Sequence, residues 1–370
     1  MGTRLNLAGY PIANSAKPKA ILKGIFGMKA IVKSTPAPGL QVMDVEEPQI
    51  GSRDVLIKVK MCGICGTDLH IYSWDEWSAN RVKPPVVLGH EFCGHVEQIG
   101  SEVTKVKVGD YVSAECHMTC EKCYQCLTNQ RHICANVRVC GIDRDGSYAE
   151  YVSIPEMYVW KLDDDVPVEL AAILDPLGNA VHTVLAGDVA GLTLAVVGCG
   201  PIGIASIPIS RACGATTVVG FDISDYRLKM ADEMGADFVV NSGKTDAVKA
   251  AMDITKGIGF DVVLEMSGNQ NGIDNAFKMV RAGGRVSLLG LPKSTITLDL
   301  ANDIVLKGLQ VQGIHGRRIF ETWYQITRLI QSKRVDLMPL ITHQMKFEDI
   351  DRAMEIMASG RCGKILLSPE

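Results

Sequence analysis

Four cysteines within one short segment are the first residues whose types and spacing predict chemistry. Cys120, Cys123, Cys126 and Cys134 form the pattern C-x2-C-x2-C-x7-C. Four thiolates complete a tetrahedral shell around zinc and leave no position open, which is the character of a structural zinc site. Two alternatives are an iron–sulfur cluster, which uses the same ligands, and four buried free thiols that bind no ion. The nearby His117 could also replace one of the cysteines. Because such a dense group of thiols is hard to explain otherwise, we expect a structural zinc site.

A second group combines a thiolate, an imidazole and carboxylates from separate parts of the chain. Cys65 lies in CGTD, His90 and Glu91 lie in LGHEFCGH, and Asp175 lies in LDPLGNA. A mixed shell of this kind can hold a catalytic zinc and keep a position for substrate or water. The HExxH pattern of metalloproteases does not fit, because the next histidine, His95, comes one residue too late. The group therefore predicts a catalytic zinc site, although spacing alone does not prove it.

Two further side chains follow Cys65 closely. Thr67 and His70 come two and five residues later, so a hydroxyl and an imidazole could carry a proton away from an alcohol at the metal. Each of them alone is as well explained as an ordinary surface or turn residue. Cys62 and Cys65 also form a C-x2-C, which could be a redox pair, but no thioredoxin-like pattern surrounds it.

A glycine-rich turn predicts dinucleotide binding. Gly198, Gly200 and Gly203 form GxGxxG directly after the apolar run LTLAVV and before a helical pattern. Glycines there allow a tight turn and close approach of a pyrophosphate, and the helix N-terminus attracts its charge. Asp222 ends the next predicted strand and can accept hydrogen bonds from the adenosine ribose, which favours NAD over NADP. The nearby Arg227 weakens this preference, because an arginine can bind the extra phosphate of NADP. The alternative to a dinucleotide site is a plain strand-to-helix turn in which Asp222 caps the next helix.

These residues need two kinds of domain to position them. From residue 28 to about 150, short β-branched runs with turns between them predict a mostly β domain. From about residue 180, strands alternate with helices, which predicts an α/β, doubly wound parallel sheet. Pro208 lies inside the first helix of that half and is expected to kink or shorten it. Helical patterns at 320–332 and 347–359 precede a closing strand, GKILLS.

Composition excludes several classes of protein. The chain has 370 residues, 47% hydrophobic and 22% charged, with a net charge of -4, so we expect two globular domains and no affinity for nucleic acid. No apolar run reaches the roughly 20 residues that a membrane span needs. Twelve clustered cysteines favour metal binding in a reducing compartment, the cytoplasm. Residues 1–27 predict a flexible N-terminal extension, with Met28 as an alternative start.

The combination of CGTD, GHE, a four-cysteine segment and a later GxGxxG resembles the zinc-containing medium-chain alcohol dehydrogenases, from about Met28 to the C-terminus. The stretches CGTDLHIYSWDEWS, LDPLGNAVHT and GIHGRRIFETWYQITRLIQS are similar to the branch of that family that oxidises L-threonine. The resemblance implies a GroES-like catalytic domain around a Rossmann domain. It divides the chain into 28–178, with a zinc lobe at 116–135, then 179–318, and a segment 319–370 that returns to the catalytic domain.

The resemblance also assigns roles to individual residues. It implies that Cys65, His90 and Glu91 bind the catalytic zinc and that Thr67 and His70 form the proton relay. It makes Asp175 an acid that assists near the metal, whether or not it is a ligand. The family's NAD contacts match the following positions: Ile202, Asp222, Arg227, Leu289, Gly290, Leu291, Ile314 and His315.

The implied reaction is the oxidation of L-threonine at C3 to 2-amino-3-oxobutyrate, with hydride transfer to NAD and two zinc ions per subunit. The nearest alternative is a polyol or 2,3-butanediol dehydrogenase of the same family. A nucleotide-binding protein without catalysis is a further alternative, but it would be expected to lose the catalytic metal ligands first. The family implies a small-molecule substrate and a homo-oligomer, a tetramer in preference to a dimer.

Overall fold

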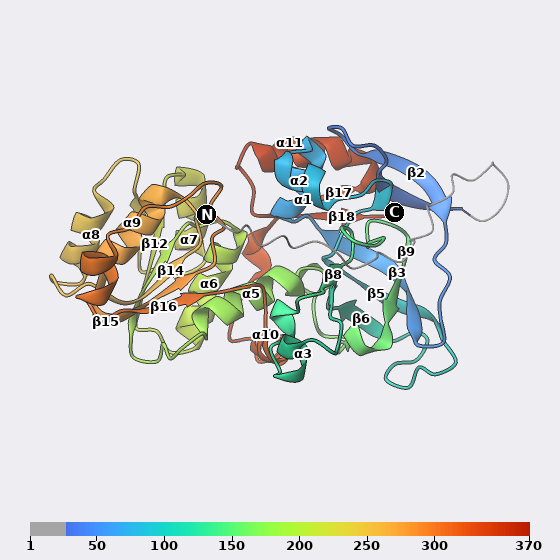
Figure 1. The fold of residues 1–370 in the computed structure, drawn as a ribbon, viewed down its shortest axis with the longest axis horizontal. Helices are drawn as coiled ribbons and strands as arrows, with labels where there is room; N and C mark the ends of the chain where they lie inside the picture. The colour runs from blue at the N-terminus through green and yellow to red at the C-terminus, as the bar shows by residue number, and fades with distance from the viewer. Residues whose placement is uncertain (1–26) are drawn as a thin grey trace, which may run out of the picture.

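The computed structural model describes residues 27–370, so the predicted extension at 1–27 lies almost wholly outside the described residues. Two halves lie side by side along the long axis of the molecule, as Figure 1 shows. One half is built on an antiparallel sheet with a parallel C-terminal strand pair, and the other is built on a parallel sheet between helices. This mixed α/β architecture confirms the predicted fold class.

The mostly β half has a sheet whose strand order is β10-β6-β5-β3-β18-β17, with β9 paired to β3. Its strands are β3 (Asp54–Gly63), β5 (Phe92–Ile99), β6 (Tyr111–Ala114), β9 (Tyr151–Pro155), β10 (Val159–Lys161), β17 (Ile341–Lys346) and β18 (Lys364–Ser368). Strand β18 comes from the C-terminus and pairs with β3, with Leu367 opposite Cys62. The last residues of the chain therefore lie beside the strand that leads to Cys65.

Smaller elements complete this half of the molecule. A second sheet contains β2 (Gln41–Glu46), β1 (Gly27–Lys33) and β4 (Val86–Val87), and a two-stranded ribbon contains β7 (His117–Met118) and β8 (Arg138–Val139). The helices are α1 (Gly66–Ser73), α2 (Glu76–Arg81), α3 (Tyr124–Leu127), α4 (Val168–Ala171), α5 (Leu174–Val184), α10 (Glu321–Gln331) and α11 (Ile350–Ala358). The run VVLGHEFCGHVEQIG forms two strands, β4 and β5, with His90 and Glu91 in the break between them.

The other half is a parallel sheet of six strands in the order β13-β12-β11-β14-β15-β16. Its strands are β11 (Thr193–Val197), β12 (Thr217–Asp222), β13 (Phe238–Asn241), β14 (Phe260–Glu265), β15 (Val280–Leu288) and β16 (Gln310–Gly313). Its helices are α6 (Pro201–Ala212), α7 (Asp225–Glu233), α8 (Ala247–Ile254) and α9 (Gln270–Met279). The strands after β11 are added on one side of the sheet as far as β13, and β14 is then added on the other side of β11. Dinucleotides bind at this switch point in doubly wound folds.

The expectation that Pro208 shortens the first helix of this sheet is wrong. Helix α6 continues past Pro208 to Ala212. A proline removes one backbone hydrogen bond, but Ile204, Ile207 and Ile209 around it are fully buried in the core. Tertiary packing therefore outweighs the local cost.

Helix α5 connects the two halves. Its residues are almost all buried, and it packs against α6 of the parallel-sheet half and α10 of the other half. Arg285 of β15 donates to the carbonyl oxygen of Val184 at its end, at 2.9 Å. Asp175 stands in the first turn of α5, so the helix carries this carboxylate into the region between the halves.

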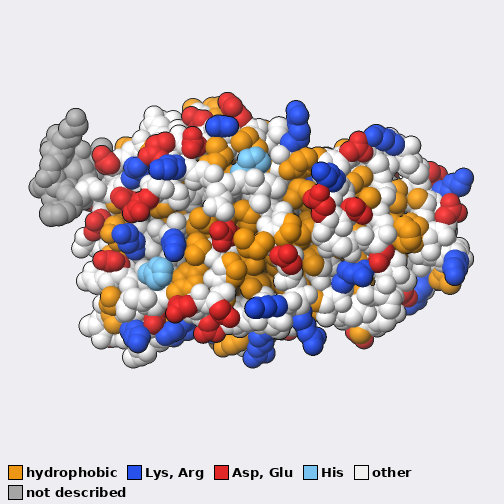
Figure 2. All heavy atoms as spheres, turned by 180° about the vertical axis from the view of Figure 1, so that it is seen from behind, with side chains coloured by type: hydrophobic (Ala, Val, Ile, Leu, Met, Phe, Trp, Pro, Cys, Tyr) orange, Lys and Arg blue, Asp and Glu red, His pale blue; other side chains and the backbone are white. Residues whose placement is uncertain are grey.

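Among residues 27–370, no helix combines the length and apolar character needed to cross a bilayer. Figure 2 shows acidic and basic side chains intermixed over one face of the molecule, with hydrophobic side chains between them.

Candidate active site

The four cysteines of the predicted structural zinc site converge in the lobe between β7 and β8. The Sγ atoms of Cys120, Cys123, Cys126 and Cys134 lie within 4.8 Å of one another. Two backbone N–H groups point at Cys134 Sγ, those of Cys120 and Asn136, both at 3.3 Å. The backbone N–H of Lys122 lowers the pKa of Cys120 to about 6, which favours the thiolate that zinc needs. This donor set fits a tetrahedral zinc ion.

Cys65, His90 and Glu91 also converge, with one ligand atom from each within 4.8 Å of the others. Cys65 is the N-cap of α1, and the other two residues follow Gly89 in the break between β4 and β5. Gly89 has a φ of +93°, and a Cβ there would lie 2.3 Å from the ring of Tyr148. This position therefore needs glycine, and the turn it allows directs the imidazole and the carboxylate inward.

Two polar atoms of this cluster lack hydrogen-bond partners among the described residues. His90 Nδ1 and Glu91 Oε1 are buried and have no hydrogen-bond partner within the part of the chain that the structure describes. Burial opposes a charge on His90, but the Cys65 thiolate beside it raises the pKa of His90 well above its usual range. Burial likewise raises the pKa of Glu91. The unsatisfied buried atoms of His90 and Glu91 beside a thiol fit a bound cation, which would displace the protons that the raised pKa values favour.

Two residues that the sequence analysis did not assign hold this cluster in place. Asp68 Oδ2 accepts from the backbone N–H of Cys65 at 2.9 Å and from the hydroxyl of Tyr148 at 2.7 Å. Lys364 of β18 donates to Glu91 Oε2 at 2.5 Å and to the carbonyl oxygen of Ile64 at 2.6 Å. Asp68 was visible inside CGTD, but no local pattern links Lys364 to a residue so far along the chain.

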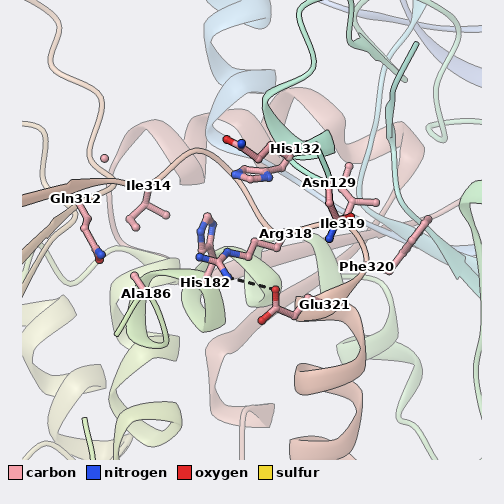
Figure 3. Close-up of a pocket in the computed structure, with 12 residues that line it drawn as sticks. Asn129, His132, His182, Ala186, Gln312, Ile314, Arg318, Ile319, Phe320 and Glu321 are labelled. Carbon is pink, nitrogen blue, oxygen red and sulfur yellow. Dashed lines mark hydrogen bonds and ion pairs between the residues drawn. The ribbon is translucent and has the colours of Figure 1, made fainter. Parts of the chain in front are cut away.

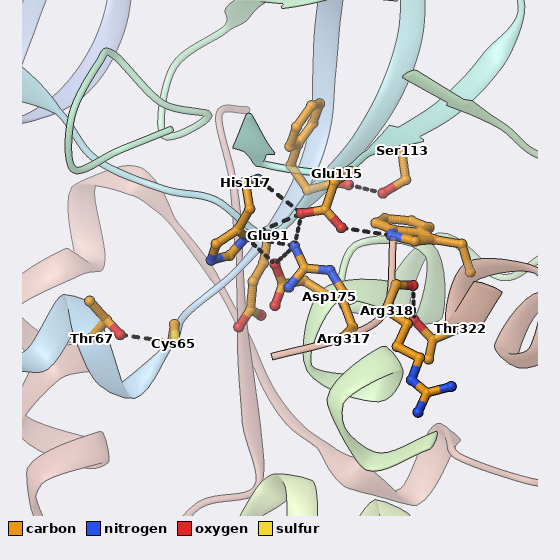
Figure 4. A network of polar contacts seen from close by, with 12 residues as sticks. Cys65, Thr67, Glu91, Ser113, Glu115, His117, Asp175, Arg317, Arg318 and Thr322 are labelled. Carbon is orange, nitrogen blue, oxygen red and sulfur yellow. Dashed lines mark hydrogen bonds and ion pairs between the residues drawn. The ribbon is translucent and has the colours of Figure 1, made fainter. Parts of the chain in front are cut away.

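Asp175 does not join this cluster in the structure. It lies with Glu115 and His117, the third group of close metal-ligating side chains. The guanidinium of Arg317 lies among them, because Arg317 Nη2 is 2.6 Å from Asp175 Oδ2 and also contacts Glu115. Figure 4 shows this arrangement beside Cys65 and Glu91. A cation of the chain itself therefore neutralises these carboxylates, and His117 lies here and not among the four cysteines.

Thr67 and His70 both lie on α1 but face different surroundings. Thr67 Oγ1 is 3.7 Å from Cys65 Sγ. His70 Nδ1 pairs with Asp75 Oδ2 at 2.5 Å near the surface. No hydrogen bond joins Thr67 to His70 in the described residues, so the proton relay stays a prediction.

The glycine-rich turn between β11 and α6 has the geometry of a ligand cradle. Gly198 has a φ of +96°, and a Cβ on Gly203 would lie 2.1 Å from the carbonyl oxygen of Gly198. Gly200 is the N-cap of α6, and a Cβ added to it would meet nothing within 4 Å. The turn is therefore closed on its protein side and open in front of the helix N-terminus, where an anionic group is favoured.

Asp222 does more than end β12. Its Oδ2 accepts from the backbone N–H of Cys199 at 2.7 Å, and its Oδ1 accepts from that of Ser224 at 2.8 Å. Ser224 is the N-cap of α7 and accepts from the backbone N–H of Arg227. Asp222 therefore does not cap α7, and it braces the glycine-rich turn from the neighbouring strand.

Of the remaining predicted cofactor residues, Ile202 lies in the first turn of α6 and Arg227 lies on α7, and the others lie at the carboxyl ends of β15 and β16. Leu289 and Gly290 donate backbone hydrogen bonds to the carbonyl oxygen of Glu265, and Ile314 donates to that of Leu288 at 2.8 Å. His315 follows Ile314 and is exposed. These strand ends lie on the same edge of the sheet as the glycine-rich turn, which is where ligands bind in open α/β sheets.

A cavity of about 700 Å³ lies between the cysteine lobe, α5 and the segment that precedes α10 (Figure 3). Its lining residues include His132 and His182, whose rings are 5.5 Å apart and nearly perpendicular. Arg318 and Glu321 form an ion pair at its rim. None of the predicted zinc ligands lines this cavity, although the predicted cofactor residue Ile314 does.

Comparisons with known proteins show the family of this chain. A family model described as an alcohol dehydrogenase GroES-like domain matches residues 51–164, and one described as a zinc-binding dehydrogenase matches residues 201–332. An L-threonine 3-dehydrogenase from Symbiobacterium thermophilum is 50% identical over 93% of this chain and 98% of that protein.

Solved structures show the same fold. A zinc-binding dehydrogenase from Sinorhizobium meliloti, bound to NADP, is similar with a TM-score of 0.86 and 29% identity, over 93% of this chain and 100% of that one. The 2R,3R-butanediol dehydrogenase from Bacillus subtilis is similar with a TM-score of 0.84 and 29% identity, with the same coverage of 93% and 100%.

Proposed function

The chain belongs to the zinc-binding medium-chain alcohol dehydrogenase family, and from this premise we propose that it oxidises L-threonine at C3 to 2-amino-3-oxobutyrate with NAD. One observation carries the class of reaction: Cys65, His90 and Glu91 converge within 4.8 Å in a chain that also has an open glycine-rich turn. The substrate rests on the relative that is 50% identical and named L-threonine 3-dehydrogenase.

The proposed chemistry divides between cofactors and protein. Bound zinc supplies polarisation of the substrate hydroxyl, and bound NAD accepts the hydride. Cys65, His90 and Glu91 would hold the metal, while Lys364 fixes one oxygen of Glu91 and leaves the other free. Thr67, whose hydroxyl lies 3.7 Å from Cys65 Sγ, would take the proton of the substrate and pass it toward His70. Asp175, paired with Arg317, would assist near the metal without binding it.

We propose NAD and not NADP as the cofactor. The carboxylate of Asp222 stands at the end of β12, beside the glycine-rich turn, where it would accept from the ribose hydroxyls. The 2'-phosphate of NADP would meet this negative charge. The relative from Sinorhizobium meliloti is bound to NADP, so the fold by itself does not choose the cofactor, and the preference rests on Asp222.

The direct test follows NADH formation by absorbance with L-threonine, D-threonine, L-serine, 2,3-butanediol and sorbitol, with and without a chelator. We expect L-threonine to be oxidised fastest with NAD, and the chelator to stop turnover. Faster oxidation of 2,3-butanediol or sorbitol would keep the family and the mechanism but overturn the substrate. Turnover that survives complete removal of zinc would overturn the catalytic metal.

A second candidate is a diol dehydrogenase, favoured by the TM-score of 0.84 to the 2R,3R-butanediol dehydrogenase. The identity of 29% to that protein is well below the 50% to the threonine enzyme, so we rank the diol second. We further propose a cytoplasmic homo-oligomer, a tetramer by resemblance. Light scattering coupled to size-exclusion chromatography measures this directly, and a monomer would contradict it.

A further inference from the structure

Arg317 is a buried cation at the point where the chain returns from the parallel sheet to the mostly β half. It is 3% exposed and follows β16, the last strand of the parallel sheet, by four residues. Its guanidinium contacts Glu115, lies 2.6 Å from Asp175 Oδ2, and lies 2.8 Å from His117 Nδ1. Figure 4 shows Arg317 directed at these side chains, whereas the next residue, Arg318, points away from them.

The two carboxylates that face Arg317 have few other ways to be neutralised. Glu115 is fully buried, and its remaining partners are the indole N–H of Trp323 at 2.9 Å and groups of His117. Burial opposes the charge of Glu115, but the guanidinium of Arg317 beside it lowers the pKa of this carboxyl to about 2. Breaking a buried pair by removing one partner leaves a charge that burial disfavours. Removing Arg317 would therefore leave both Glu115 and Asp175 without the cation that they share.

Helix α5, which carries Asp175, leaves space for Arg317 because it has a glycine where the arginine packs. Gly178 lies one turn after Asp175 on α5, and a Cβ there would lie 3.0 Å from Cδ of Arg317. The aliphatic part of Arg317 therefore packs against a helix position without a side chain. The guanidinium also lies 5.9 Å from the centre of the Trp323 ring. These contacts fix one geometry for the guanidinium.

Arg317 also anchors the segment that holds two predicted cofactor residues. Ile314 donates to the carbonyl oxygen of Leu288 at 2.8 Å, which ties the start of the segment to the parallel sheet. Gly316 accepts from Nδ1 of His182 at 2.8 Å. Arg317 then ties its end to the mostly β half. Ile314 and His315 lie between these attachments, so a shift at Arg317 would move them.

From these contacts we infer that Arg317 is a positioning residue that orients Asp175 beside the predicted catalytic zinc ligands and holds the cofactor-contacting segment Ile314–His315 against the mostly β half. This inference rests on the proposed dehydrogenase function. It predicts that one side chain affects both turnover and cofactor binding, although it touches neither substrate nor the predicted zinc ligands. A purely structural ion pair would affect stability alone.

The test compares Arg317→Ala with Arg334→Ala, in the zinc-loaded full chain. Arg334 is the control, because it is an exposed arginine that does not line the cavity shared with Ile314. We expect Arg317→Ala to lower kcat by roughly 10–100-fold, the range for residues that orient a metal site. We expect the dissociation constant of NADH, measured by fluorescence, to rise about tenfold. Added methylguanidinium should restore part of both, and Arg334→Ala should stay within about twofold of wild type.

Arg317→Lys keeps the charge but has a shorter reach and loses the planar guanidinium, whose Nη2 contacts both carboxylates, so it serves if Arg317→Ala does not fold. We expect it to melt near the wild-type temperature with lowered kcat and weaker NADH binding. Wild-type kcat and NADH affinity in Arg317→Lys, or a stability loss without either change, would overturn the inference. NADH binding does not require turnover, so wild-type protein that binds NADH but leaves L-threonine unoxidised would contradict only the proposed function.

Discussion

At the scale of residues, the predicted zinc ligands depend on partners that fix their free atoms. Glu91 offers one oxygen to Lys364 and leaves the other without a partner among the described residues. Asp68 holds the backbone of Cys65 and lies 4.0 Å from His90 Nδ1. Such outer partners set the tautomer and orientation of metal ligands. The site is therefore preorganised by residues that are not themselves ligands.

Replacing one ligand tests the catalytic zinc assignment. We expect Cys65→Ser to reduce turnover by several orders of magnitude, because a neutral hydroxyl is a poor substitute for a thiolate on zinc. Zinc content should fall from two to one per subunit, with the fold retained in circular dichroism. Cys93→Ser, at a buried cysteine outside both clusters, is the control. Full activity and two zinc ions in Cys65→Ser would remove the assignment.

A second residue-level test concerns cofactor choice. Asp222→Asn keeps one acceptor oxygen, enough for the backbone N–H of either Cys199 or Ser224 but not both, and it loses the negative charge. We expect kcat/KM for NAD to fall and the preference for NAD over NADP to shrink by about tenfold or more, since the repulsion of the 2'-phosphate is gone. Steady-state kinetics with both cofactors measure this. An unchanged preference would show that Asp222 does not face the ribose.

At the scale of elements, single glycines decide whether strand ends and helix starts can meet. The turn between β11 and α6 places the backbone of Gly203 against Gly198, and a Cβ on Gly203 would lie 2.1 Å from a backbone oxygen that has little room to move. Helix α5 uses Gly178 in the same way to admit Arg317. Close backbone approach is therefore a requirement of both the cofactor turn and the link between the halves.

We expect Gly203→Ala to weaken NADH binding by about tenfold or more and to lower stability by about 1–3 kcal/mol, as overpacking does. Isothermal titration with NADH and urea denaturation give the two values. Gly200→Ala is the matched control for the free protein, because its added Cβ meets nothing within 4 Å. It should keep the stability of the wild type and still bind NADH weakly, since the methyl would lie in the open cradle. Unchanged affinity in both variants would argue against a pyrophosphate at this turn.

At the scale of the whole molecule, two halves share one core that passes through α5. Buried residues of α5, of α6 and of α10 form one hydrophobic cluster. Asp175 lies at the start of α5, at the end of this shared core, and it pairs there with Arg317. Relative movement of the halves would therefore disturb these contacts first.

The four-cysteine lobe should matter for stability and not for chemistry. It forms an excursion between β7 and β8 with exposed apolar side chains such as Tyr124 and Leu127, so zinc supplies much of what holds it together. We expect Cys123→Ser to lower the unfolding temperature by several degrees and to speed proteolysis within the lobe, while kcat at low temperature stays near wild type. Differential scanning calorimetry and limited proteolysis measure this. A wild-type unfolding temperature would contradict a structural zinc.

The sequence by itself determined the features that depend on local spacing. The four cysteines, the GxGxxG turn and the alternation of strands and helices each lie within a short stretch, so their chemistry and the fold class could be predicted. Cys65 and the GHE pair required the family resemblance, because three separated ligands have no local signature. The roles assigned to site residues remain predictions that the experiments above test.

Only the tertiary structure decided which distant side chains neutralise one another. Glu115 and Arg317 are 202 positions apart, and Glu91 and Lys364 are 273 apart, so no periodicity connects them. The structure also placed His117 beside Asp175, carried α6 through Pro208, and turned Asp222 toward the glycine-rich turn. Burial makes an unpaired charge costly, and the partner that satisfies it is chosen by packing in three dimensions and not by order along the chain.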